Sequence, residues 1–327
     1  MGAIHYSFSY EGDRRDFDLS KRIGFCIYCG KNDCELTDEH VAPEGLQGDV
    51  LLREASCKSC ADLTGYSELR VSRGPLAIVR ETQQLYGKRR SGKRPEKLTL
   101  EIRRRDWTIE KLVLPVAEFP FVFRMPRFPA PRRLQPARQH DADYHGRFDY
   151  RQFDTLDGLR KGAAIIDSDL RRDRLQLDMN VYELSKVLAK IAYGFSIVLL
   201  GPYSIKPYVT ELIIAPKDTA PSFLHDVGGA FVGEDRIESL TTTDLGKVVV
   251  RTELVRGNAL VLARVQLLGH LGAPVYEVVV GELVDQRSDV LPLVPVDRSP
   301  SMTYDELRLW SGRITADAPL MSRGDLP

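Results

Sequence analysis

Residues 26–65 read CIYCGKNDCELTDEHVAPEGLQGDVLLREASCKSCADLTG and hold all five cysteines of the 327-residue chain. Four of them form two Cys-x-x-Cys pairs: Cys26, Cys29, Cys57 and Cys60. Each pair makes a tight turn that aims two thiolates at one point, and two pairs satisfy tetrahedral Zn²⁺. We therefore predict one structural zinc ion bound by these four residues, with Cys34 as a bystander. A disulfide framework is disfavoured, because the cysteines gather in one segment of a long chain.

The segment between the two pairs is longer than a zinc site alone requires. It has 27 residues, against the roughly 15–20 that are typical of a zinc ribbon. Asp38, Glu39 and His40 lie in its middle. Carboxylates hold hard divalent ions, and a neutral imidazole can take a proton from water that attacks phosphorus. The segment therefore predicts a hydrolytic metal site, and a plain zinc ribbon without chemistry is the alternative.

In this pattern, residues 23–70 resemble the HNH endonuclease superfamily, the ββα-metal nucleases. The resemblance is to the variant with CxxC, then (D/E)H-x-x-P, a glycine-containing loop and a second CxxC. It implies a hairpin that carries the catalytic histidine and a helix that begins at the second pair. It also implies that His40 is the general base and that Glu39 binds a catalytic Mg²⁺ or Mn²⁺. Asp38 is an alternative ligand or a partner of the ligands.

One position departs from this family. Asn or His usually follows the last cysteine and binds or orients the catalytic metal, whereas this chain has Ala61, which cannot coordinate. Asp62 and Glu68, on the same expected helix, are the candidates for the missing ligand, and Asp62 is preferred. The alternative is a catalytically inactive, zinc-stabilised module that binds nucleic acid or protein.

The chain has no overall charge bias, with 46 Lys and Arg against 46 Asp and Glu, but residues 80–111 carry eleven basic and five acidic residues. Basic clusters bind phosphate without sequence specificity, whereas the alternative is a solvated loop. The predicted nucleic-acid-binding residues are Arg80, Lys88, Arg89, Arg90, Lys93, Arg94, Arg103, Arg104 and Arg105. The family resemblance favours DNA over RNA as the partner.

The predicted fold class is α+β, in three parts. Residues 1–118 form the zinc-containing HNH-like domain with its basic flank, 119–145 a Pro/Arg-rich linker, and 146–327 an α+β companion domain. The five prolines of residues 119–139 are incompatible with a regular helix or a central strand. Alternating residues in 97–102 and 107–114 predict a β-hairpin.

In the companion domain, apolar residues at helical spacing predict a buried helix over 178–201, with Asn180 and Glu183 resembling a capping box. Apolar runs then predict strands of an antiparallel sheet at 210–215, 228–233, 247–255, 259–269 and 275–283. This domain is expected to serve target recognition, regulation, or self-association into a homo-oligomer. No apolar run is long enough to span a bilayer, and we expect a cytoplasmic protein without a membrane partner.

Overall fold

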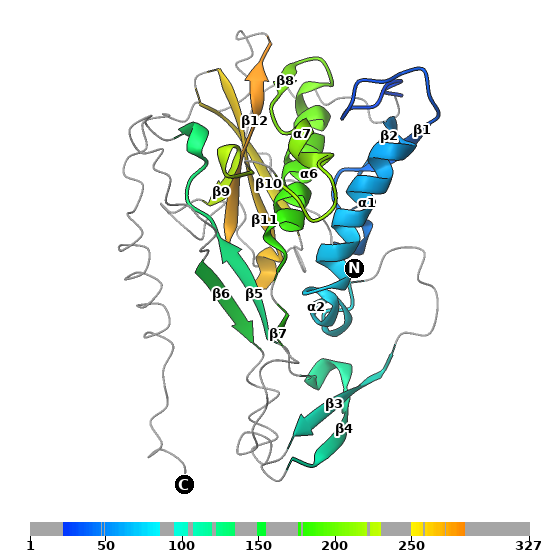
Figure 1. Cartoon of the computed structure of the whole chain (residues 1–327), viewed down its shortest axis with the longest axis vertical. Coiled ribbons are helices and arrows are strands. Elements are labelled where there is room, and N and C mark those ends of the chain that lie inside the picture. The colour runs from blue at the N-terminus through cyan, green and yellow to red at the C-terminus, as the bar shows by residue number, and fades with distance from the viewer. Residues whose placement is uncertain are drawn as a thin grey trace.

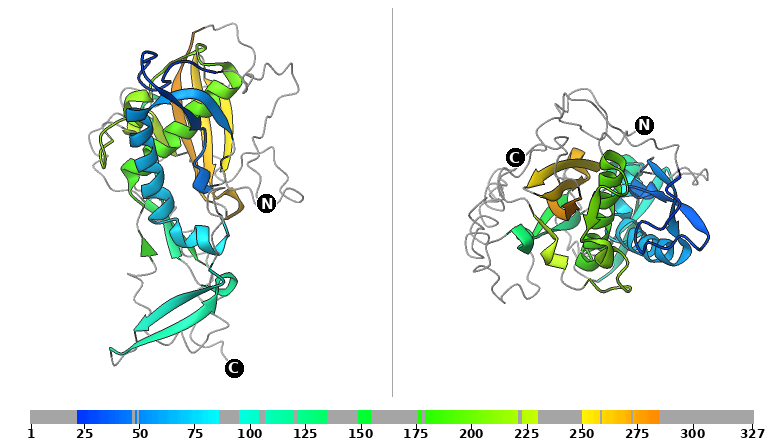
Figure 2. Two further views of the ribbon diagram at one scale, coloured as in Figure 1. Left: turned by 90° about the vertical axis from the view of Figure 1, so that its right-hand side faces the viewer. Right: turned by 90° about the horizontal axis from the view of Figure 1, so that it is seen from above.

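In the computed structural model, a small unit that carries the four cysteines (residues 22–82, called the zinc-site unit below) and an antiparallel sheet lie on opposite sides of one long helix, α6 (Val181–Leu200) (Figures 1 and 2). The α+β class is thereby confirmed. The structure describes residues 22–46, 48, 50–85, 95–103, 107–119, 122–134, 149–154, 176–177, 179–220, 223–229, 250–257, 259–271 and 273–284.

The zinc-site unit has the β-β-α order that the family resemblance implies. Strands β1 (Leu36–His40) and β2 (Leu51–Cys57) are antiparallel, and helix α1 (Lys58–Arg73) follows β2 directly. The short helix η1 (Glu44–Leu46) lies in the loop between the strands, and helix α2 (Ala77–Thr82) follows α1.

A bulge in the β1–β2 hairpin turns Glu39 toward the interior. The pairing shifts between Thr37 and Glu39, and opposite this shift Glu54 adopts a left-handed φ of 49°. The exposed Asp38 stabilises the bulge, since its Oδ1 accepts a hydrogen bond from the Glu54 amide at 3.0 Å. Bulges re-aim side chains in this way, and Glu39 is only 7% exposed.

Helix α6 confirms the buried helix that the sequence predicts. The Asn180 side chain accepts hydrogen bonds from the amides of Tyr182 and Glu183, which caps the helix. Glu183 does not close a capping box. Its Oε1 accepts from the Asp218 amide and pairs with Lys186.

The companion sheet has the strand order β10-β11-β12-β8, with β9 also pairing with β12, and every pairing in it is antiparallel. Its strands are β8 (Ile205–Pro207), β9 (Val227–Gly229), β10 (Val250–Gly257), β11 (Leu260–Leu267) and β12 (Val275–Leu283). The predicted strand at 210–215 is wrong, because Thr210–Ile213 form helix α7. Short apolar runs do not distinguish a strand from a buried helix turn. Here Leu212 and Ile213 are buried and α7 packs on α6.

The proline-rich stretch contains a strand, contrary to prediction. Strand β5 (Val122–Arg127) pairs with β6 (Asp149–Asp154) and with β7 (Gln176–Leu177), so β5 is the middle strand of three. The sheet tolerates Pro126 because β7 pairs only with Val122 and Phe123, and no other strand of the described residues pairs with that side of β5 at the proline. The predicted hairpin of β3 (Lys97–Arg103) and β4 (Ile109–Pro115) is confirmed.

One apolar core runs from the zinc-site unit through α6 into the companion sheet. At the contact between the two halves, a Cβ added to Gly194 of α6 would lie 3.3 Å from a Val41 methyl carbon. Nearby, the Tyr193 hydroxyl donates to the Ile27 carbonyl at 3.1 Å. The core also includes Met125 and Phe128, which lie within the predicted linker at 119–145. Within the described residues, no helix is long and apolar enough to cross a membrane.

Replacing Gly194 by Leu tests this close approach. The new side chain would push α6 away from Val41, and we expect a loss of about 1–3 kcal/mol in the free energy of unfolding, measured by urea denaturation. The matched control is Gly65→Leu on α1, where an added Cβ meets nothing within 4 Å. The control should keep or raise stability, because Leu favours helix over Gly. Equal midpoints for the two variants would contradict the close packing.

Candidate functional site

The four predicted cysteines converge on one point. Their sulfur atoms all lie within 4.8 Å of one another, and Cys29 Sγ is 3.7 Å from Cys57 Sγ. Zn–S bonds of about 2.3 Å in a tetrahedron separate the sulfurs by about 3.8 Å. All five cysteines are free thiols, and Cys34 is exposed and outside the group. The prediction of a four-cysteine group that can hold a metal ion such as zinc is confirmed.

Local backbone geometry builds both halves of this group. Gly30 has a φ of 76°, and its amide donates to the Cys26 carbonyl at 2.8 Å, which closes the first turn. Glycine adopts this conformation without strain. The first turn is tied to β2, because the Ile27 amide donates to the Ala55 carbonyl at 2.9 Å. Cys57 ends β2 and precedes the first residue of α1, so the second pair spans a strand end and a helix start.

The acid–base properties of the thiols reflect how close the sulfur atoms lie to one another. Burial raises the pKa of Cys57, but hydrogen bonds from Ser59 and from the Cys60 amide outweigh it and bring the pKa to about 6. Burial and the neighbouring Cys57 and Cys26 sulfurs raise the pKa of Cys60 far above its ordinary value. Four thiolates so close repel one another, and a bound Zn²⁺ removes that repulsion. The donor set therefore fits a structural zinc ion.

A second cluster of charges lies where α6 packs on the β-β-α unit. The Lys190 ammonium is 2.8 Å from Glu39 Oε1 and also pairs with Glu68 Oε1 on α1. Its third hydrogen bond goes to the backbone carbonyl of His40. The side chains of Lys190 and Glu39 are 3% and 8% exposed, and that of Glu68 is 21% exposed. A single buried lysine thus joins β1, α1 and α6.

The electrostatics of this cluster favour the charged lysine. Burial lowers the pKa of Lys190, but Glu39 and Glu68 outweigh it and hold the pKa above its usual value. The buried Tyr28 hydroxyl hydrogen-bonds Glu39. Burial, followed by the two carboxylates, raises the pKa of Tyr28 well above 10. The Glu39 carboxylate is therefore engaged by an ammonium and a phenol.

The two acidic candidates on α1 lie in different surroundings. Glu68 meets Glu39 through Lys190, whereas Asp62, which the sequence analysis preferred, pairs with Lys58 on the exposed side of the helix. Ala61 offers no ligand atom. In this arrangement the cation between Glu39 and Glu68 is the Lys190 ammonium, so the residues present do not fit Mg²⁺ or Mn²⁺ at that point.

His40 ends β1 beside this cluster. The residue is half-buried, and its Nδ1 is fully buried with no hydrogen-bond partner in the structure as described. Lys190 fixes its backbone rather than its ring. Sequence reasoning missed Lys190, although there was a signal. Lys186 and Lys190 lie four residues apart in a helix predicted to be buried, and buried ammonium groups require carboxylate or carbonyl partners.

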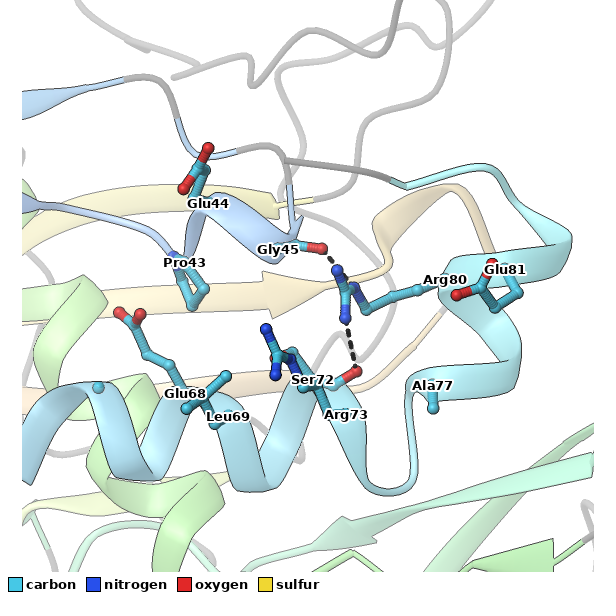
Figure 3. Close-up of a pocket in the computed structure, with 11 residues that line it drawn as sticks. Pro43, Glu44, Gly45, Glu68, Leu69, Ser72, Arg73, Ala77, Arg80 and Glu81 are labelled. Atoms are coloured by element: carbon cyan, nitrogen blue, oxygen red, sulfur yellow. Dashed lines mark hydrogen bonds between the residues drawn. The ribbon is translucent and has the colours of Figure 1, made fainter. Parts of the chain in front are cut away.

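A pocket of about 760 Å³ opens beside Glu68, between η1, α1 and α2 (Figure 3). Arg80 braces one wall by donating from Nε to the Gly45 carbonyl at 2.7 Å and from an NH₂ group to the Ser72 carbonyl at 3.2 Å. The charged residues that line the pocket are Glu44, Glu68, Arg73, Arg80 and Glu81. With both signs present, the pocket alone selects neither anions nor cations.

Most of the predicted nucleic-acid-binding residues lie outside the described residues: Lys88, Arg89, Arg90, Lys93, Arg94, Arg104 and Arg105. Arg103 is described only as part of the β3 backbone. Arg80 has a structural role in the pocket wall.

Comparison with protein-family models, with curated proteins and with solved structures finds no match for this chain. The chain combines a β-β-α unit, whose four cysteines could hold a metal ion, with an α+β second half that packs against it.

Zinc content tests the four-cysteine group. The purified chain should contain one Zn²⁺ per molecule by elemental analysis, and Cys60→Ala should lose most of it and unfold at lower temperature, because metal binding and folding are coupled. Cys34→Ala removes the exposed thiol outside the group and should keep full zinc content. Equal zinc loss in both variants would contradict the assignment.

Replacing Lys190 by Met tests the buried ion cluster. Two carboxylates would lose their shared cation, and we expect a loss of about 3–5 kcal/mol in the free energy of unfolding. The matched control is Lys58→Met, which breaks an ion pair whose side chains are 78% and 62% exposed and should cost no more than about 1 kcal/mol. Similar urea midpoints for the two variants would show that the cluster contributes little.

Proposed function

We propose that this chain is an HNH-type endonuclease that hydrolyses phosphodiester bonds of nucleic acid. The observation that carries the proposal is the β-β-α unit held by the four-cysteine group, with His40 at the end of β1 and Glu39 beside it. The motif order CxxC, Glu-His-x-x-Pro, CxxC supports the same reading. The zinc site is structural in this proposal, because four protein sulfurs leave no open coordination position.

His40 is the proposed general base. A neutral imidazole takes the proton of a water molecule as that water attacks phosphorus. The P–O bond to one sugar oxygen breaks, and that oxygen leaves as an alcohol after it takes a proton from solvent. Such base catalysis contributes about 10²–10⁴-fold to a rate. Lys190 helps to position His40, because it donates a hydrogen bond to the His40 carbonyl and pairs with the neighbouring Glu39 carboxylate. Glu39 and Glu68 share the Lys190 ammonium, so the plasmid assay below includes both Mg²⁺ and Mn²⁺.

A second candidate function is a zinc-stabilised module that binds nucleic acid or protein without hydrolysing it. Two observations favour it. Lys190 neutralises the two acids that converge from β1 and α1, and Ala61 takes the position after the last cysteine. With all three of its N–H groups engaged, the Lys190 ammonium has no donor left to stabilise the charge on a phosphate during cleavage.

Nicking of supercoiled plasmid separates the two candidates. For the endonuclease, the zinc-loaded chain should nick DNA with added Mg²⁺ or Mn²⁺, and His40→Ala should lower the rate by about 100-fold or more. The matched control is His225→Ala, which removes an exposed histidine in the helix η5 (Phe223–His225), on the companion side, and should leave the rate unchanged.

If the wild type and His40→Ala are equally inert with both ions on DNA and RNA, the endonuclease proposal is wrong. Retained binding of an oligonucleotide in that case would support the binding module.

A further inference from the structure

The β3–β4 hairpin projects from the rest of the molecule as a two-stranded ribbon (Figures 1 and 2). Its strands have seven residues each and pair in register from Lys97↔Pro115 to Arg103↔Ile109, without a bulge. Among the described residues, β3 and β4 pair only with each other. Two such strands lie about 4.8 Å apart, so the ribbon is narrow.

One face of the ribbon is attached to the zinc-site unit. The alternate residues Leu98, Leu100, Leu112 and Leu114 pack with Phe119 and with Ile78 of α2. Helix α2 in turn forms part of the pocket beside Glu68, through Ala77, Arg80 and Glu81. The ribbon is therefore anchored to the unit that carries His40, and its orientation follows that unit.

The opposite face of the ribbon is exposed and combines apolar and basic side chains. Ile109 and Val113 are 50% and 62% exposed. Lys97, Thr99 and Lys111 are exposed with the same parity, as is Pro115 at the inner end of β4, which we leave out of the set. We call the other five residues the ribbon face. Trp107, 66% exposed, lies just before β4 at the outer end of the ribbon.

Charge and shape point to one kind of partner. The described charges of the ribbon face are two lysines, and residues 80–111 as a whole carry a net charge of +6, from eleven basic and five acidic residues. The major groove of B-form DNA, about 12 Å wide, admits a two-stranded β-ribbon and presents thymine methyl groups to apolar side chains. The major groove of A-form RNA is too deep and narrow for side chains to read.

We infer that the ribbon face enters the major groove of duplex DNA and thereby positions the zinc-site unit on its substrate. Lys97 and Lys111 would contact phosphates or base edges. The apolar side chains of Ile109, Val113 and Trp107 would contact thymine methyl groups in the major groove. This inference rests on the proposed action on nucleic acid and adds the surface that would hold the duplex.

Val113→Glu tests the inference in a binding assay that needs no hydrolysis. Fluorescence anisotropy follows a labelled DNA duplex of about two helical turns, with zinc-loaded protein and no added Mg²⁺ or Mn²⁺. The new carboxylate faces the phosphates, and the affinity should fall by about tenfold or more at low salt. The matched control is Val284→Glu, at a valine that is 66% exposed just after β12, and its affinity should stay within about twofold of wild type.

A gain-of-function variant and two competitors complete the test. Thr99→Lys adds a cation to the exposed ribbon face and should tighten binding and steepen its salt dependence, because one more phosphate is neutralised. Duplex RNA and single-stranded DNA of the same sequence should compete at least about tenfold less well than duplex DNA. Unchanged binding by Val113→Glu, or equal competition by duplex RNA, would overturn the inference.

The outcomes distinguish this inference from the endonuclease proposal. If Val113→Glu loses duplex binding while Val284→Glu keeps it, the ribbon face is supported. If the wild type also never nicks plasmid, the endonuclease proposal is refuted. Nicking at the wild-type rate by Val113→Glu at low DNA concentration refutes the ribbon face and leaves the endonuclease standing.

Discussion

The buried ammonium of Lys190 ties the molecule together, because its three hydrogen bonds reach β1 and α1 from a helix that belongs to the second half of the chain. Removing three charges from water costs several kcal/mol for each ion, so the cluster persists only while every partner is in place. The position of α6 against the zinc-site unit is consequently specified by charge as well as by apolar packing. Any shift of α6 would leave the buried Glu39 carboxylate without its cation.

The four-cysteine group and the Lys190 cluster support the same small unit in different ways. A unit of about sixty residues cannot bury much apolar surface by itself, and a bound metal can substitute for part of a core. The four sulfurs connect the turn at Cys26 and Cys29 with the end of β2 and the start of α1. Lys190 instead connects the end of β1 with the middle of α1. Between these two points the bulge at Asp38 sets the direction of Glu39. His40 is therefore placed by short-range and long-range interactions together.

Three features lie at different places along the unit. The four-cysteine group lies at the start of α1, His40 lies at the end of β1, and the β3–β4 ribbon carries exposed apolar and basic side chains. The pocket between η1, α1 and α2 lies beside Glu68, and α2 also anchors the ribbon. A ligand held by the ribbon would thus be kept at a defined orientation to His40, whether the chain hydrolyses it or only binds it.

The family resemblance supplied the β-β-α order, whereas local sequence patterns predicted the four-cysteine metal group, the long helix, the β3–β4 hairpin and β12. Each of these local patterns depends on spacing within a few residues, on periodicity, or on turn chemistry. Only the tertiary structure decided that Lys190, and no residue of the motif, lies between Glu39 and Glu68. Those partners are 151 and 122 residues away along the chain, and no local pattern encodes such a pairing. It also decided that Glu68 rather than Asp62 meets Glu39, because packing selects which face of α1 is covered. Strand β5 and helix α7 depend in the same way on the neighbours against which they fold.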